Sequence, residues 1–220
     1  MKKKIFVRAP CLSQSGYGEQ SRFALRALRS QEDIFDIYVQ PINWGKTGWL
    51  WEDNEFRNWV DKKIEKTQVA SAQGNLMPDI SLQITIPNEF ERLAPVNIGY
   101  TAGIETSHVA PLWLQKGNEM DKILVVSQHA KDTYVNTQAT AQDQQGNARP
   151  YKLETPVEVV HERTEIPDPE PIDALNLTTD FNFLVVGQFG PRKNMLNTIR
   201  WWVEEFIDQD VGLVLKTSMV

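Results

Sequence analysis

Two segments of the chain place glycines or cations where an anion could bind. The first, Gly16-Tyr17-Gly18, lies between a predicted strand at residues 4–9 and a predicted helix at residues 19–30. Glycines there let backbone N–H groups approach an anion closely, and the helix N-terminus adds partial positive charge. Ser21 stands where a G-x-G-x-x-G motif has its third glycine, and no P-loop lysine follows. A phosphate site and a plain tight turn therefore both fit this segment.

The second segment, residues 187–194, carries the adjacent cations Arg192 and Lys193 between a predicted strand and a predicted helix. In open α/β sheets, ligands bind in the crevice beyond the carboxyl ends of the strands. Two cations beside a helix N-terminus are repelled by its partial positive charge unless water or an anion neutralises them. A phosphorylated ligand would remove that conflict, and so would full solvation.

Other side chains suit the binding of a hydroxylated substrate. Residues 98–108 follow another predicted strand and bring together the Glu105 carboxylate, several hydroxyls and the His108 imidazole. Either residue can instead be structural. Trp44, Trp49 and Trp51 could stack on a sugar face or pack into the core. The histidines at positions 108, 129 and 161 lie on separate elements and Cys11 is the single cysteine, so no metal site and no intrachain disulfide are expected.

Short apolar runs alternate with helical patterns, which predicts an α/β fold: a Rossmann-like parallel sheet with helices on both faces. Strands are predicted at residues 4–9, 34–39, 79–86, 96–101, 122–126 and 157–161, and helices at residues 19–30, 51–66, 111–120 and 128–135. Ser127 is expected to cap the last of these helices. The polar residues 137–149 are expected to form a surface excursion.

Three closely spaced prolines, Pro167, Pro169 and Pro171, predict an extended connection between domains. We expect a first domain at residues 1–168, a linker at 169–177 and the opening of a second Rossmann-like domain at 178–220. That opening is one βαβ unit, with strands at 181–187 and 211–216 and a helix at 194–207. One such unit cannot cover both faces of its sheet, so it either docks on the first domain or continues past residue 220. Continuation is favoured.

Composition and charge narrow the function classes. The 220 residues are 41% hydrophobic and 24% charged, which excludes disordered and collagen-like proteins. A net charge of −6 argues against a nucleic-acid partner, because phosphate binding needs a basic surplus. No apolar run is long enough to span a membrane, and the apolar stretch after Lys4 is too short for a signal peptide. A cytoplasmic protein is expected.

Four segments together resemble one enzyme family: Gly16-Tyr17-Gly18, residues 98–105, residues 125–131 and residues 186–194. They look like the group 1 (family 4) glycosyltransferases, which are retaining enzymes of the GT-B fold that use nucleotide-sugar donors. The resemblance covers nearly the whole chain, and its most specific parts are Tyr-Thr-Ala-Gly-Ile-Glu at 100–105 and Pro-Arg-Lys-Asn at 191–194. It implies two Rossmann-like domains facing each other across a cleft. The N-terminal domain would bind the acceptor and the C-terminal domain most of the donor.

The resemblance also implies roles for individual residues. Gly16, Tyr17 and Gly18 would close over the donor diphosphate, and Arg192 and Lys193 would neutralise the diphosphate as it leaves. The catalytic residue of the acceptor domain would be Glu105 or His108, and the choice stays open. No metal or cofactor is implied, because the nucleotide sugar is a co-substrate. The chain departs from the family at Gln188, where many members carry Arg, and residues 1–220 lack the family's Glu-x7-Glu motif in a strand-to-helix turn.

The implied function is metal-independent hexosyl transfer with retention, in polysaccharide, lipopolysaccharide or glycoconjugate synthesis. The acceptor would be a glycan, a lipid-linked molecule or a small molecule. The chain resembles a fragment, and whether it is active alone, contacts a membrane surface or forms a homodimer stays open. The rival is a non-catalytic α/β module that binds a glycan or a partner protein, or dimerises through apolar strand residues such as Leu213, Val214 and Leu215.

Overall fold

The computed structural model describes residues 2–142, 145, 147–164, 166, 168–169 and 175–217. The chain divides into two compact units, Met1–Thr164 and Glu165–Val220, and each is described by itself. Of the expected linker, residues 170–174 lie outside the described residues, and so do Pro167 and Pro171 of the proline-rich segment. The last three residues of the expected second domain, 218–220, also lie outside them.

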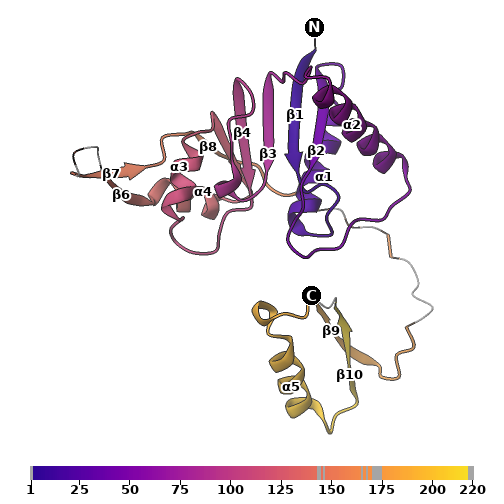
Figure 1. The fold of residues 1–220 in the computed structure, drawn as a ribbon. Coiled ribbons are helices and arrows are strands. Elements are labelled where there is room, and N and C mark those ends of the chain that lie inside the picture. The colour runs from indigo at the N-terminus through magenta and orange to yellow at the C-terminus, as the bar shows by residue number, and fades with distance from the viewer. Residues whose placement is uncertain are drawn as a thin grey trace. The chain divides into compact units, whose positions relative to one another are not determined.

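The first unit is built on a six-stranded sheet whose neighbouring strands are all parallel. Its order is β2-β1-β3-β4-β5-β8 (Figure 1). The strands are β1 (Lys3–Ala9), β2 (Phe35–Pro41), β3 (Ile80–Ile84), β4 (Val96–Thr101), β5 (Lys122–Val125) and β8 (Val157–Val159). The chain runs outward from β1 to β2 and then returns to β3 on the other side of β1, so the strand order reverses between β1 and β3. This arrangement confirms the Rossmann-like parallel sheet.

Helices cover both faces of this sheet, as expected. They are α1 (Gly16–Arg29), α2 (Glu55–Ala72), the single turn η1 (Pro87–Glu89), α3 (Pro111–Gly117) and α4 (Gln128–Asn136). Alternate side chains of β5 point to opposite faces of the sheet. Leu124 packs in the core cluster under α1, whereas Ile123 and Val125 pack with α3 and α4. Helix α2 runs beside the edge strand β2, where Thr67 Oγ1 accepts the Val39 N–H at 2.7 Å (Figure 1).

Two helices of the first unit begin at different residues from those predicted. Helix α1 begins at Gly16 rather than at residue 19, because Ser15 is its N-cap and its hydroxyl accepts the Gly18 N–H at 3.0 Å. The glycine segment is thus the first turn of the helix and not a loop before it. Helix α2 begins after its cap Asn54, so the prediction that Trp51 opens this helix was wrong; Trp51 is 90% exposed.

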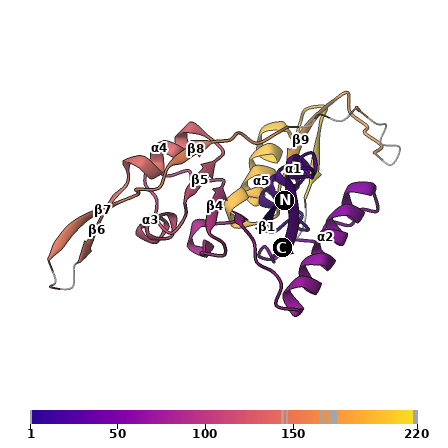
Figure 2. The ribbon, with the colours of Figure 1, turned by 90° about the horizontal axis from the view of Figure 1, so that it is seen from above.

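The polar segment near residue 140 is a β-hairpin that the sequence analysis described only as a surface excursion. Its strands, β6 (Gln138–Gln142) and β7 (Ala148–Lys152), pair antiparallel in a sheet of their own. Both ribbon views show the hairpin extending away from the main sheet (Figures 1 and 2). The predicted cap of α4 is confirmed, because the Ser127 hydroxyl accepts the Ala130 N–H at 3.1 Å.

The second unit contains the expected βαβ arrangement. Strands β9 (Phe181–Val186) and β10 (Val211–Lys216) pair in parallel, and the turn η2 (Pro191–Lys193) and helix α5 (Met195–Phe206) connect them. Phe183 packs against Phe206 with ring centroids 5.0 Å apart, which joins helix and sheet. Other apolar side chains of β9 remain exposed: Leu184 is 66% and Val186 67% accessible.

Candidate functional site

The carboxyl ends of β1, β3 and β4 meet at one edge of the first unit, the lower edge of its sheet in Figure 1. The strand order reverses between β1 and β3, so this edge is the topological switch point of the sheet. Ligands of open α/β sheets bind in the crevice at such a point. The segments that leave this edge are residues 10–15 after β1 and residues 102–110 after β4.

Tyr17 joins these two segments. Its hydroxyl lies 2.8 Å from Thr101 Oγ1 and accepts the Ala102 N–H at 3.1 Å. Its ring lies against Trp44, with centroids 4.3 Å apart. Burial raises the pKa of the Tyr17 phenol above its usual value. The structure therefore brings the first turn of α1 against the Tyr-Thr-Ala segment, two motifs that the sequence analysis treated separately.

The turn between β1 and α1 is held from inside by a buried arginine. Arg22 is 6% exposed and donates from Nη1 to the carbonyl oxygens of Cys11 (3.0 Å) and Ser13 (2.9 Å). Its charge is paired with Glu19, one turn earlier on the same helix. The Ser13 carbonyl lies so close to Gly18 that a Cβ there would approach its oxygen to 2.0 Å. Glycine at position 18 is thus required by packing.

The two glycines of the first turn have different surroundings. A Cβ at Gly16 would meet no atom within 4 Å, so the space beside it is open. The first N–H groups of a helix lack intrahelical acceptors, and the Gly18 N–H is already taken by Ser15. The N–H groups of Gly16 and Tyr17 occupy the first two helical positions. They are therefore the groups of this turn that could donate hydrogen bonds to an anion.

A hollow of about 230 Å³ lies beside this turn. It is lined by residues that follow β1 and β2, including two of the tryptophans considered in the sequence: Leu12, Ser13, Ile42, Asn43, Trp44, Gly45, Thr47, Gly48 and Trp49. The Ser13 hydroxyl forms hydrogen bonds with those of Ser15 (2.8 Å) and Thr47 (2.7 Å). Aromatic rings beside hydroxyls suit a sugar, whose faces are apolar and whose edges are polar. Sequence reasoning missed Ser13 and Thr47, which carry no motif.

Glu105 and His108 both lie on the segment that follows β4, and both are exposed. His108 Nδ1 lies 2.9 Å from the Ser107 hydroxyl, and Thr106 donates to the His108 carbonyl at 2.8 Å. Within the part of the chain that the structure describes, neither side chain forms a hydrogen bond with the first turn of α1. The two residues thus share the edge with Tyr17 without contacting it.

Arg192 and Lys193 belong to the second unit, where they form the turn η2 immediately before α5. Both are exposed. The stem of Lys193 lies over Gly187 at the end of β9, since a Cβ on that glycine would be 3.7 Å from Lys193 Cγ. Asn194 ends the turn in the left-handed conformation, with φ of 52°. The two cations therefore stand at the carboxyl edge of the β9–β10 pair.

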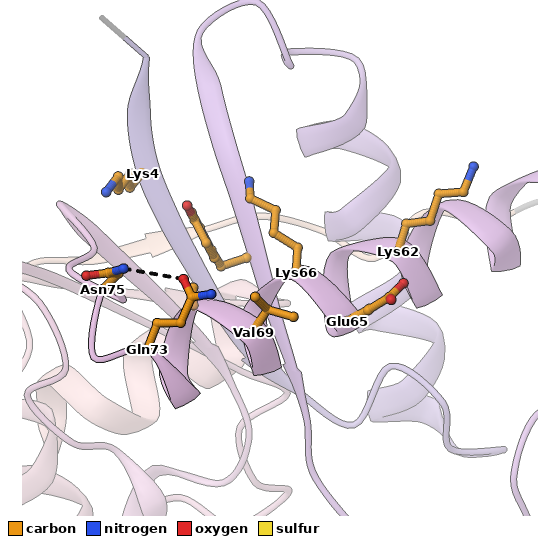
Figure 3. A pocket seen from close by; sticks show the side chains of 9 residues that line it. Lys4, Lys62, Glu65, Lys66, Val69, Gln73 and Asn75 are labelled. Carbon is orange, nitrogen blue, oxygen red and sulfur yellow. Dashed lines mark hydrogen bonds between the residues drawn. The ribbon is translucent and has the colours of Figure 1, made fainter.

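A more open hollow of about 480 Å³ lies on another part of the first unit (Figure 3). It is bounded by α2 and by Lys4 near the start of β1, towards the amino-terminal ends of the strands. The Lys66 ammonium lies 3.9 Å from the centre of the Tyr38 ring and is paired with Asp36. This hollow is at the opposite end of the strands from Tyr17, so we do not assign it to the candidate site.

No protein-family model matches this chain, and no curated protein or solved structure is similar enough to it to count as a match. Among the described residues, no group of three or more His, Cys, Asp or Glu side chains is placed to hold a metal ion. No helix in the same residues combines the length and apolar character needed to cross a membrane. A proposal about function therefore rests on the fold and on the geometry of the carboxyl edge.

Proposed function

We propose that this chain is the acceptor-binding domain of a retaining glycosyltransferase together with the opening of its donor-binding domain. The observation that carries the proposal is the Tyr17 hydroxyl bound to Thr101 and Ala102. It brings a helix N-terminus suited to phosphate against a segment that carries a carboxylate and an imidazole. A donor and an acceptor hydroxyl bound there would lie next to each other.

The phosphates of a nucleotide sugar would bind to the first turn of α1 and to the cations of η2. Gly16 and Tyr17 offer backbone N–H groups at the positive end of a helix, with open space beside Gly16. Arg192 and Lys193 add two positive charges at the carboxyl edge of the second unit.

Transfer would begin with cleavage of the bond between the sugar C1 and the diphosphate oxygen. Negative charge grows on the leaving phosphate, where Arg192, Lys193 and the N–H groups of Gly16 and Tyr17 stabilise it. The acceptor hydroxyl attacks C1 from the face the phosphate leaves, and its proton passes to a phosphate oxygen. This route needs no protein nucleophile, so Glu105 or His108 would orient the sugar rather than bond to it.

The acceptor sugar would occupy the hollow lined by Trp44 and Trp49. Trp49 is 59% exposed, so its ring is available for stacking against a sugar face. The Thr47 hydroxyl lines the same hollow and offers a hydrogen-bonding group for a sugar hydroxyl. The hollow is a single small chamber of about 230 Å³, which favours one monosaccharide unit over a flat polymer surface.

Calorimetric titration with a panel of UDP-, GDP- and ADP-sugars tests the proposal. At least one donor should bind saturably. The Arg192→Ala/Lys193→Ala variant should bind that donor at least tenfold more weakly, because it loses charge-assisted hydrogen bonds. Arg200→Ala removes an exposed cation of α5 paired with Glu204 and is the matched control. If the double variant and the control bind the donor equally well, the phosphate role is wrong.

A second function is favoured by the exposed apolar side chains of the second unit. Leu184 and Val186 of β9 and Trp201 of α5 are between 57% and 67% accessible. Apolar surface of this kind marks a protein-binding face. In this alternative the chain is a non-catalytic module that dimerises or binds a partner. Its test is light scattering, which should show a concentration-dependent mass that Leu184→Ser/Val186→Ser abolishes, with no nucleotide-sugar binding.

A further inference from the structure

The hairpin of β6 and β7 leaves one edge of each of its strands unpaired. The two strands form a sheet of their own, and both ribbon views show it extending away from the main sheet (Figures 1 and 2). Among the described residues, no backbone hydrogen bond joins β6 to any segment other than β7. An unpaired edge is a template on which another strand can add, so proteins normally protect such edges.

The base of the hairpin is anchored on the first unit. Asn118 Nδ2 donates to the Lys152 carbonyl oxygen at 3.0 Å and lies 3.2 Å from the Tyr151 hydroxyl. Ala139 and Tyr151 pack against the apolar cluster that α3 and α4 cover. The hairpin is therefore an arm that is held at its base and carries its strand edges away from the domain.

The edge of β7 is protected, whereas the edge of β6 is not. Pro150 stands at the centre of β7, opposite Thr140, and has no N–H to donate. Arg149 and Lys152 add two positive charges to the same strand. The sequence of β6, Gln-Ala-Thr-Ala-Gln at 138–142, contains no charge and no proline. The edge of β6 is therefore the one suited to pairing with another strand.

The register shows which backbone groups of β6 point outward. Residue pairs in an antiparallel ladder alternate between pairs that exchange hydrogen bonds and pairs that do not. Pro150 lacks an N–H, so Thr140–Pro150 is a pair of the second kind. The N–H and C=O groups of Thr140 therefore point away from β7, and the alternation gives those of Gln138 and Gln142 the same direction. These three residues each present a donor and an acceptor at the free edge.

The sequence of β6 is the same in both directions. Residues 138–142 form a palindrome centred on Thr140. When two copies of β6 lie antiparallel about a two-fold axis at Thr140, the two Thr140 side chains face each other and Gln138 faces Gln142. Paired threonines are favourable, glutamine amides can both donate and accept, and no like charges meet. The strand is thus complementary to a second copy of itself.

We propose that the free edge of β6 pairs with the same edge of a second copy of this chain. The two hairpins form a four-stranded antiparallel sheet in the order β7-β6-β6-β7, with two-fold symmetry, the commonest symmetry of homo-oligomers. The outward groups of Gln138, Thr140 and Gln142 supply about six backbone hydrogen bonds across the axis. Four strands also form a more stable sheet than an isolated hairpin. This surface is distinct from the apolar face of the second unit and does not depend on the glycosyltransferase proposal.

Sedimentation velocity over a concentration range of about 10–500 µM tests the proposal, because a small interface predicts a weak dimer. The unaltered chain should show a monomer–dimer equilibrium. Thr140→Lys and Thr140→Glu each place like charges opposite each other at the axis, so each should dimerise at least about tenfold more weakly. An equimolar mixture of the two variants places opposite charges there and should form a heterodimer. Thr178→Lys and Thr178→Glu, at an exposed threonine of the second unit, are the matched controls and should dimerise as the unaltered chain does.

A proline variant tests the backbone pairing itself. Because the Thr140 N–H points away from β7, Thr140→Pro keeps the ladder of the hairpin and removes the hydrogen bonds at the axis. Dimerisation should weaken at least about tenfold, whereas Thr140→Val keeps the N–H and the β-branched shape and should still dimerise. Circular dichroism checks that both variants fold.

Three results would overturn the proposal. The first is a chain that stays monomeric up to about 500 µM, which would leave the edge of β6 to a strand of a different protein. The second is a failure of the mixed Thr140→Lys and Thr140→Glu chains to associate. The third is a dimer that Leu184→Ser/Val186→Ser abolishes and the Thr140 variants do not, which would place the interface on the second unit.

Discussion

The Tyr17 hydroxyl lies 2.8 Å from the Thr101 hydroxyl, and this contact joins segments 84 residues apart in the sequence. Because the same phenol oxygen accepts the Ala102 N–H, the backbone after β4 is held to the first turn of α1. The first turn of α1 and the segment after β4 are thereby joined at one edge of the sheet. The relative placement of Glu105 and the α1 N-terminus depends on this link.

Tyr17→Phe removes both hydrogen bonds while keeping the ring against Trp44. We expect the free energy of unfolding to fall by about 1–3 kcal/mol, because the Ala102 N–H and the Thr101 hydroxyl lose a buried partner. Urea denaturation followed by circular dichroism measures the change. Tyr38→Phe is the control, since its hydroxyl makes a single, longer bond of 3.2 Å to Asp36. Equal effects of the two variants would contradict a special role for Tyr17.

The two glycines of the first turn should respond oppositely to alanine. Gly18→Ala brings a Cβ to 2.0 Å from the Ser13 carbonyl oxygen, so the turn held by Arg22 must shift. We expect a loss of about 1–3 kcal/mol, as for other overpacked sites. Gly16→Ala meets open space and should be neutral or stabilising by up to about 1 kcal/mol. The melting temperatures of the two variants measure this difference. A Gly18→Ala protein as stable as the Gly16→Ala protein would refute the packing argument.

Cys11 should be unreactive in the folded protein. It is 1% exposed, and burial raises the pKa of its thiol from 9.0 to about 11. A thiol reagent at pH 8 should therefore label it only after unfolding, because the reactive form is the thiolate. Labelling with and without denaturant, followed by mass spectrometry, measures this. Rapid labelling of the native chain would show that the β1–α1 turn opens.

The same pKa shift predicts a loss of stability in alkali. The unfolded chain releases the Cys11 proton at lower pH than the folded chain, so deprotonation favours unfolding. The contribution of the protonated Cys11 thiol to the free energy of unfolding is fully present below pH 9 and is lost as the pH rises to about 11. The expected loss is about 2–3 kcal/mol, and burial of Tyr17 and Tyr134 acts in the same direction. Urea titrations at pH 8 and pH 10.5 should show a smaller loss for Cys11→Ala, and an identical loss would contradict this cause.

Much of the first unit could be predicted from local patterns. The bounds of β4 agree with the predicted strand at every residue, because buried parallel strands are short apolar runs between polar turns. The cap Ser127 was also predicted correctly, since a serine after a buried strand and before a helical pattern is a strong local signal. The start of α1 was missed because two glycines suggested a loop, while Ser15 caps a helix that contains them.

The candidate site depended on contacts that no local pattern reveals. The link between Tyr17 and Thr101 follows from strand order, since it needs β1 and β4 to end at the same edge with β3 between them. The hydroxyl cluster of Ser13, Ser15 and Thr47 likewise joins the loop after β1 to the loop after β2.

Backbone NMR titration with nucleotide sugars tests the central claim most directly, because each amide reports its own contact. The donor that binds should shift the amides of Gly16 and Tyr17 in the first unit and those of Gly190, Arg192 and Lys193 in the second. Shifts at both groups, saturating together with one dissociation constant, are the result that we predict. The absence of shifts at 10 mM of every donor, or shifts confined to residues away from both groups, would contradict the assignment as a glycosyltransferase.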